Sequence, residues 1–253
     1  MAILQRALPY DLEAQRRLPG VSPLDPADWL LVDEAYGAQM AERERLIADR
    51  PGAVLALEPA AEQAAGELLE MVLAHLPSGF DRKAERAVRR PDGVVVQIDG
   101  TAPLRTLGHL VQEDFCLLQK QGEEHVMTGA VLCFPASWTL AEKLNRPLIG
   151  IHRPVQAYGA DLAKRVQRLF DGLRPGRPLW RFNMLEYDDP VLFQPRPEAS
   201  PRPGQGTAPS PVRPPRYLRS ERQCLVRLPR TGAVVFSIHT FVLERGAPDG
   251  TAP

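Results

Sequence analysis

The sequence predicts an α+β fold, in which an antiparallel sheet of roughly five or six strands has helices outside it. Strand-like segments follow one another through hairpin-length turns, and hairpins outnumber strand–helix–strand units. Segments with apolar residues at helical spacing lie between these strands. The 253 residues, 44% hydrophobic and 25% charged, suit a single domain over residues 1–253.

Two helices are expected before residue 80. The first is marked by apolar residues at helical spacing: Trp29, Val32, Tyr36 and Met40. The second extends over about 60–76 and ends at Pro77–Gly79. The expected elements that follow are a strand at 94–98, a helix at 104–111, strands at 115–120 and 126–134, a helix from about 138 to 145, a helix around 162–173 and a strand at 179–185.

The segment Arg219–Phe241 predicts a final hairpin. Two apolar runs flank the turn Pro229–Gly232, where the glycine supplies a permissive backbone. A proline-rich stretch, Pro195–Pro215, precedes it and has almost no large apolar residue. We therefore expect a mobile loop between two strands there, and a short flexible tail over 246–253.

Charge and cysteine usage exclude several classes of protein. Lys+Arg 31 equals Asp+Glu 31, so no global basic field favours nucleic acid or an anionic membrane. The three cysteines have neither CxxC nor zinc spacing, which predicts reduced core residues and a cytoplasmic protein. No signal-peptide pattern or long apolar run is present, so we expect no membrane span.

Histidines are the remaining candidates for metal chemistry. The sequence lacks GxGxxG, GxxxxGK[ST], GxSxG and HExxH motifs, and none of its five histidines pairs with another at helical spacing. One histidine suffices for heme, because the porphyrin supplies four nitrogens. His152 is the candidate, since it lies within the apolar segment Leu148–Val155; a core histidine is the alternative from the residues alone.

Several short motifs occur in one order along the chain. They are Gly20–Leu24, Trp29 with Asp33 and Tyr36, Gln112–Asp114, FPxSW at Phe134–Trp138, Lys143, IHxPV at Ile151–Val155, RxN at Arg181–Asn183, and ERQ followed by LVRLPRTGAVVF at 221–236. This succession resembles the alpha subunit of the heme-dependent oxidative N-demethylase family over most of Gly20–Phe241. The resemblance implies a PAS-like curved sheet enclosing heme b, with His152 as the iron ligand.

The resemblance also implies a reaction and a partner. Members of the family remove a methyl group from dimethylamine as formaldehyde, using O2 and NADPH, and a flavin and iron–sulfur reductase subunit supplies the electrons. This chain has no flavin or iron–sulfur motif of its own, so its electrons would come from such a partner.

Candidate site residues follow from these motifs. Arg181, Arg222 and Arg227 are candidates for heme propionates, because guanidinium binds carboxylate bidentately; strand capping or a surface ion pair is the alternative. Glu113 and Asp114 are candidates for binding an ammonium group or relaying a proton; a helix-end or turn feature is the alternative. Trp138 is a candidate for contact with the porphyrin, with an ordinary core tryptophan as the alternative, and Asn183 is a candidate for orienting a water or substrate near the iron. His239 stands where a basic residue is commoner and is a second possible ligand.

Two other functions are compatible with the residues. One is a non-catalytic PAS-like protein that binds heme or a small molecule as a sensor; the absence of a coiled-coil heptad argues mildly against signalling. The other is a structural or interaction module whose histidine belongs to the core. A heme absorbance band and formaldehyde release separate the three.

Overall fold

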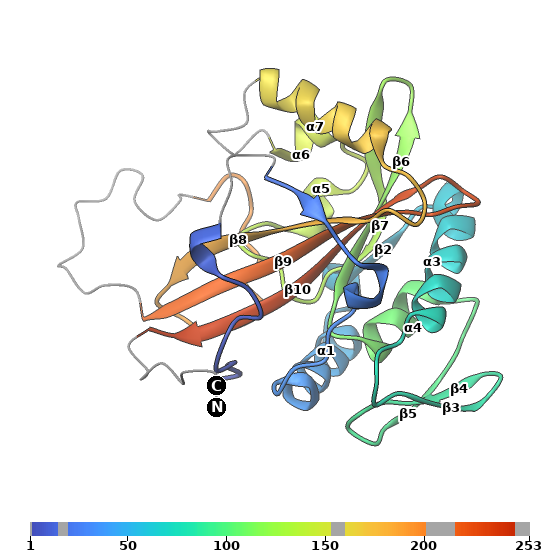
Figure 1. The fold of residues 1–253 in the computed structure, drawn as a ribbon, viewed down its shortest axis with the longest axis vertical. Coiled ribbons are helices and arrows are strands. Elements are labelled where there is room, and N and C mark those ends of the chain that lie inside the picture. Colours follow the sequence, from blue (N-terminus) through green and yellow to red (C-terminus); the bar gives the residue numbers. More distant parts are fainter. Residues whose placement is uncertain (1, 15–19, 153–159, 201–215, 246–253) are drawn as a thin grey trace.

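The computed structural model of the chain describes residues 2–14, 20–152, 160–200 and 216–245 (Figure 1). Its helices and antiparallel sheets form an α+β fold, as predicted. Most of the expected Pro195–Pro215 loop and the whole 246–253 tail lie outside the described residues.

A seven-stranded sheet forms the centre of the molecule, and every pair of neighbours is antiparallel. In spatial order its strands are β1 (Ser22–Pro23), β8 (Leu179–Tyr187), β9 (Tyr217–Arg227), β10 (Val234–Glu244), β6 (Asp114–Gln121), β7 (Glu124–Val131) and β2 (Leu55–Leu57). The predicted final hairpin is confirmed as β9–β10, with Gly232 at φ 69° in its turn. The two edge strands were not predicted, because two or three residues are too few to show a period.

Helices cover both faces of this sheet (Figure 1). On one face lie α1 (Tyr36–Asp49), α3 (Glu62–Ala74) and α4 (Pro103–Leu110), and the short α2 (Pro51–Val54) follows α1. On the other lie α5 (Leu140–Lys143), α6 (Leu148–His152) and α7 (Ala160–Gly172). Single 3-10 turns occur at Leu12–Ala14, Pro26–Asp28 and Pro59–Ala61.

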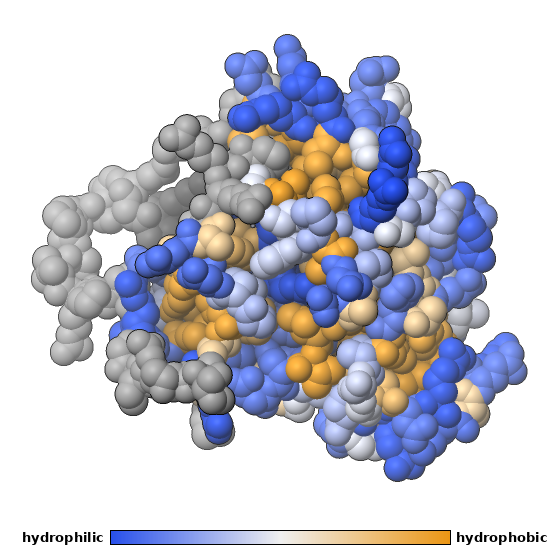
Figure 2. All heavy atoms as spheres, in the orientation of Figure 1, coloured by the Kyte–Doolittle hydropathy of each residue, from blue (hydrophilic) through white to orange (hydrophobic). Residues whose placement is uncertain are grey.

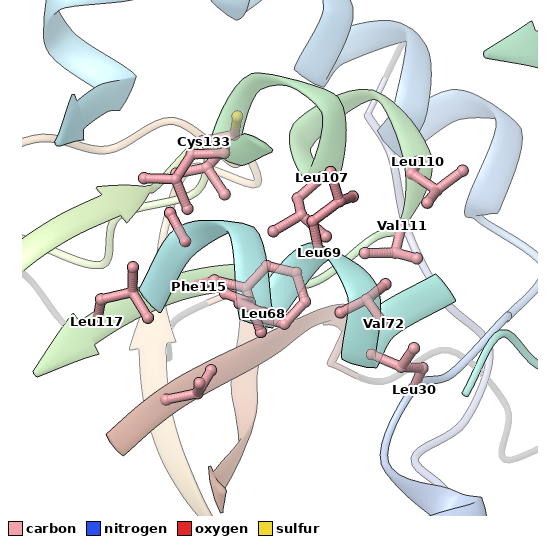
Figure 3. Packing of buried hydrophobic residues seen from close by; sticks show 14 of the residues in the cluster. Leu30, Leu68, Leu69, Val72, Leu107, Leu110, Val111, Phe115, Leu117 and Cys133 are labelled. Atoms are coloured by element: carbon pink, nitrogen blue, oxygen red, sulfur yellow. The ribbon is translucent and has the colours of Figure 1, made fainter. Parts of the chain in front are cut away.

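Two apolar clusters fill the spaces between the sheet and its helix layers. The larger packs Leu68 and Val72 of α3 and Leu107 of α4 against Phe115 and neighbouring strand residues (Figure 3). The smaller joins β6–β10 to the inner sides of α5, α6 and α7. In the space-filling view the outer side of α7 is polar and apolar atoms gather beneath it (Figure 2).

The helix α4 lies unusually close to its neighbours at Gly108. A Cβ there would be 2.6 Å from Ile47 Cδ1 and 2.9 Å from Val131 Cγ2, so only glycine allows this contact of α4 with α1 and β7. This approach brings the chain after α4, residues 111–114, to the end of β6, where the buried polar groups described below begin.

The first predicted helix begins later than expected. Trp29 ends a 3-10 turn and Val32 is 38% exposed, whereas α1 starts only at Tyr36. The intervening backbone is held instead by side chains of the 112–113 segment, since Leu31 N–H donates to Glu113 Oε1 and Asp33 N–H to Gln112 Oε1. The helical spacing of apolar residues therefore includes Trp29 and Val32, although tertiary contacts keep this segment out of the helix.

Three short strands form a second sheet that was predicted only in part. They are β3 (Asp81–Ala84), β4 (Ala87–Arg89) and β5 (Val95–Gln97), paired in that order. The strand expected at 94–98 is therefore present, but it belongs to this small sheet. The helix expected from Trp138 to Asn145 shortens to α5, because Ser137 adopts φ 63° and Thr139 is extended.

The three cysteines are buried and unbonded to one another, as predicted. Among the described residues, no helix is long and apolar enough to cross a bilayer.

Candidate functional site

Strands β8–β10 carry buried polar groups on both of their faces. The register pairs Arg181 with Gln223 and Phe182 with Arg222, so the two arginines face opposite sides of the sheet. The face toward α1, α3 and α4 carries the His239 cluster: Gln5, Asp33, Gln39, Gln112, Glu113 and His239. The face toward α5, α6 and α7 carries the Glu221 cluster: Arg181, Asn183, Arg219, Glu221, Gln223 and Thr240.

His239 lies between two carboxylates. Its Nδ1 is 3.0 Å from Glu113 Oε1 and its Nε2 is 3.1 Å from Asp33 Oδ2. Burial by itself would lower the pKa of His239, but the hydrogen bonds to both carboxylates raise it to about 9. The imidazolium is therefore the form expected at neutral pH, with both ring N–H groups donating.

Amide side chains complete the His239 cluster. Gln112 Nε2 donates to Asp33 Oδ1 at 2.8 Å, and Gln5 Nε2 donates to Asp33 Oδ2 at 2.9 Å. The same Gln5 bonds the backbone of Val242. Because both nitrogens of His239 are occupied, this histidine has no lone pair for iron unless the cluster is dismantled.

Asp114 is bound from three sides in the core. Its Oδ1 accepts from Arg43 Nη1 at 2.6 Å and from the Cys133 N–H, and its Oδ2 accepts from the Phe134 N–H. Arg43 is fully buried and donates further to carbonyl groups at residues 108, 112 and 113. These bonds tie α1 to the ends of β6 and β7, and they give Asp114 a structural environment.

Arg222 is also fully engaged. Its guanidinium donates to the Asp28 and Trp29 carbonyls at 2.6 and 3.1 Å and lies over the Trp180 ring. It thus fixes the N-terminal segment on the α1 side of the sheet, where β10 places His239 directly opposite it. This position separates Arg222 from the other arginines considered for a propionate.

Neither Arg181 nor Arg222 forms an ion pair among the described residues, but the Arg181 guanidinium has one hydrogen-bond acceptor where that of Arg222 has two. Nη1 donates to Gln223 Oε1 at 2.6 Å, while Nε is buried without a partner. Desolvation lowers the pKa of Arg181, and Glu221 offsets this only in part. A desolvated guanidinium with unused donors suits a carboxylate ligand.

Glu221 is the carboxylate of this face. Its Oε2 accepts from Asn183 Nδ2 at 2.8 Å and from Gln223 Nε2 at 3.0 Å, and Asn183 Oδ1 in turn accepts the Glu221 N–H. The Arg219 guanidinium is 3.8 Å from Oε1. Asn183 therefore positions Glu221 rather than standing free.

Trp138 and Arg227 border the same face at different points. Trp138 is half-buried and packs on the smaller apolar cluster, together with Ile151 of α6. Arg227 Nη1 donates to the Phe170 carbonyl of α7 at 3.2 Å. The predicted residues Trp138, Arg181, Asn183 and Arg227 thus share one side of the sheet, whereas Glu113 and Arg222 lie on the other.

The predicted ligand, His152, ends α6 on this side of the sheet. The structure describes its backbone but not its side chain. The buried Lys143 Nζ donates to the carbonyl of the preceding residue, Ile151, at 2.6 Å and to Glu198 Oε1 at 2.5 Å. Lys143, a residue of the quoted motifs, therefore fixes the end of the helix that carries His152.

Several residues that the structure brings together are only weakly marked in the sequence. Arg43, Arg219 and Thr240 have no distinguishing spacing, because each is an isolated charge or hydroxyl in a strand or helix, and Asp33 is marked only as part of a motif with Trp29 and Tyr36. Glu221 was noted only as part of the ERQ motif. A charged residue within an otherwise apolar helical stripe, as Arg43 is in α1, was the one usable signal.

Heme fits the residues of the α6 side in two respects. Arg181 has an unpaired Nε and no ion pair within the described part of the chain, which leaves a cation for a propionate. The smaller apolar cluster, which includes Leu225 and Ile238, lies on the same side of the sheet. No group of three or more His, Cys, Asp or Glu side chains with metal-site geometry occurs in the part of the chain described, and heme iron requires only one protein ligand.

The chain is thus an α+β protein with a candidate cofactor site between its sheet and the layer formed by α5, α6 and α7. A family model described as "Haem-dependent oxidative N-demethylase, alpha subunit-like" matches residues 20–245. The chain belongs to this family, as the succession of motifs predicted. The family description names a heme-dependent oxidoreductase and, as an alpha subunit, a component that works with other subunits.

Proposed function

We propose that the chain binds heme b in a PAS-like domain and catalyses oxidative N-demethylation of a small secondary or methylated amine. The observation that carries the proposal is Arg181, a half-buried cation whose Nε is buried without a partner, on the side of the sheet where α6 ends in His152. The family assignment supports the same cofactor class.

The residues have distinct roles in this proposal. His152 provides the axial nitrogen, Arg181 holds one propionate, and Arg227 is the candidate for the other. Trp138 and the apolar cluster exclude water from the porphyrin edge. Asn183 acts through Glu221, to which it is hydrogen-bonded.

Three of the sequence-based candidates fit the scaffold better than the site. Asp114 has its acceptors filled by Arg43 and two backbone N–H groups, and Glu113 is bound to His239 on the opposite side of the sheet. The guanidinium of Arg222 donates its hydrogen bonds to backbone carbonyls. We assign these residues to holding the N-terminal segment and α1 against the sheet.

The reaction balances with one O2 and two electrons. The methyl carbon leaves as formaldehyde, the amine retains a hydrogen in its place, and the second oxygen atom becomes water after two protons and two electrons are supplied. When bound, heme supplies the O2 activation. The protein residues orient the amine, bind the propionates and limit access of water. A flavin and iron–sulfur reductase is the proposed electron source.

Absorbance and product analysis test the proposal. Purified protein should show a Soret band, and dimethylamine with O2 should give formaldehyde when a chemical reductant or a flavin–iron–sulfur reductase is added. NADPH alone should give none. If the protein takes up no heme during reconstitution, this result would contradict the cofactor assignment. Heme-loaded protein that binds O2 but releases no aldehyde from any methylamine would favour the sensor function.

A further inference from the structure

Buried polar atoms without partners gather around Glu221. Seven such side-chain atoms occur among the described residues, and three of them are Arg181 Nε, Arg219 Nε and Thr240 Oγ1. Buried polar groups in folded proteins are nearly always bonded, so a cluster of exceptions indicates a missing ligand or water. A propionate is already the proposed partner of Arg181. The unpaired Thr240 hydroxyl beside Glu221 still needs a partner.

Thr240 and Glu221 face each other across neighbouring strands. They are register partners of β10 and β9, so both side chains project from the same side of the sheet. Asn183 of β8 is the partner of Glu221 on its other edge. Thr240, Glu221 and Asn183 thus form one row across three adjacent strands.

The carboxylate of Glu221 is oriented with one oxygen unused. Asn183 and Gln223 both donate to Oε2, whereas among the described residues Oε1 accepts no hydrogen bond. Its nearest charged neighbour, Arg219, is 3.8 Å away and donates its Nη groups to the Phe134 and Leu192 carbonyls. Two fixed amides therefore hold a carboxylate whose second oxygen is free to accept.

The Thr240 hydroxyl provides a second acceptor beside it. The residue is 1% exposed and its Oγ1 has no partner, although its backbone carbonyl receives Gln5 and Gln39 from the opposite side of the sheet. A hydroxyl can accept from an N–H and donate to a carboxylate. A ligand with two N–H hydrogens would satisfy both Glu221 Oε1 and Thr240 Oγ1.

We propose that Glu221 and Thr240 bind the nitrogen of the amine substrate, with Asn183 and Gln223 as positioning residues. The inference rests on the proposed function for the identity of the ligand, a small protonated secondary amine. It places recognition of the nitrogen on β9 and β10, on the same side of the sheet as Arg181. A methylammonium ion with two N–H donors matches the two acceptors, and a quaternary ammonium ion does not.

The test uses the full chain and two probes, dimethylammonium and tetramethylammonium chloride. Binding is followed by calorimetry for heme-free and heme-reconstituted protein, and by the shift of the heme spectrum. Wild-type protein should prefer dimethylammonium. Glu221→Gln should weaken its binding by at least about tenfold, because a hydrogen bond to a charged group is lost. Thr240→Val, which keeps the side-chain shape, should weaken it about threefold. For tetramethylammonium, the affinity of both variants should fall by a smaller factor relative to the wild type.

Glu67→Gln is the matched control. Glu67 is a carboxylate that accepts the Arg230 and Thr231 N–H groups at the β9–β10 turn, away from the row. It should bind both probes as the wild type does. Should Glu221→Gln fail to fold, Thr240→Val carries the test.

The outcomes separate this inference from the proposed function. Wild-type protein that takes up heme, while Glu221→Gln and Thr240→Val bind dimethylammonium normally, would overturn the inference alone. Protein that binds no heme but loses dimethylammonium binding in both variants would overturn the heme assignment and support the amine site. Wild-type protein that binds neither probe in either form would overturn the inference.

Discussion

Arg181 and Arg222 lie on adjacent strands but face opposite sides of the sheet, because Arg222 is the register partner of Phe182. The guanidinium of Arg222 donates to the backbone carbonyls of Asp28 and Trp29. Arg181 has one amide partner and a buried, unpaired Nε. The sequence offers both residues as candidate propionate ligands, and the pleat of one strand pair distinguishes them.

Arg181→Met should impair heme retention without unfolding the protein. Because desolvation lowers the pKa of this guanidinium, its removal should leave the stability of the heme-free protein unchanged or slightly higher. Heme transfer to apomyoglobin should be about tenfold faster or more, as expected for loss of a charge-assisted hydrogen bond. Heme loss at the wild-type rate would argue against the propionate assignment.

Arg222→Met should give the opposite pattern. Two buried backbone carbonyls would lose their donors, which should lower the free energy of unfolding by about 2–3 kcal/mol in urea titrations of heme-free protein. Under conditions where the variant is folded, heme transfer should match the wild type. Rapid heme loss with unchanged stability would place Arg222 in the heme site after all.

His152→Ala should abolish stable heme binding, because it removes the proposed axial nitrogen. Ferric and ferrous absorbance spectra of reconstituted protein measure this directly. His75→Ala is the control: His75 is exposed, and among the described residues its ring hydrogen-bonds the Met71 carbonyl of the preceding helix and packs edge-on to Trp29, so the spectra of this variant should be unchanged. A folded His152→Ala protein with wild-type spectra would show that another residue binds the iron.

Asp114→Asn should lower the stability of the protein, because Asp114 has a structural role. It leaves the buried Arg43 without its carboxylate and weakens the acceptor for the Cys133 and Phe134 N–H groups. Breaking one side of a buried ion pair typically costs about 3–5 kcal/mol, measurable as a lower midpoint in urea. Wild-type stability combined with lost activity would instead support the proton-relay role considered from the sequence.

His239 should make the protein less stable at alkaline pH. Its pKa is about 9 in the folded state, after burial and the stronger opposing effect of Asp33 and Glu113, against about 6.5 in unfolded chains. A raised pKa contributes stability that is complete below about pH 6.5 and is lost as pH rises through 9. The loss is on the order of 3 kcal/mol.

Urea titrations between pH 6 and 10 measure this dependence. His239→Gln should flatten the alkaline decline, whereas His125→Gln should not, since burial lowers the pKa of His125. At the acid end the sign reverses. The pKa of Asp33 is lowered by its bond to His239, against the effect of burial, so this contribution disappears as pH falls below the normal aspartate range. An alkaline slope unchanged in His239→Gln would contradict the account.

Local pattern and motif order determined the family, the α+β class and most long elements. The β9–β10 hairpin followed from two apolar runs around Pro229–Gly232, and the helix at 103–110 from its apolar spacing, because these signals are contained within a few neighbouring residues. Cysteine spacing likewise predicted three buried thiols without disulfides.

Tertiary structure alone decided which candidates share a site. Glu113 and Asp114 are adjacent in the chain, yet one bonds His239 and the other Arg43, and Asn183 proved to be a partner of Glu221. Such pairings depend on the register between strands distant in sequence, and a shift of one residue reverses the face of every side chain. The sequence specifies that register through the packing of the whole core, so no short motif reveals it.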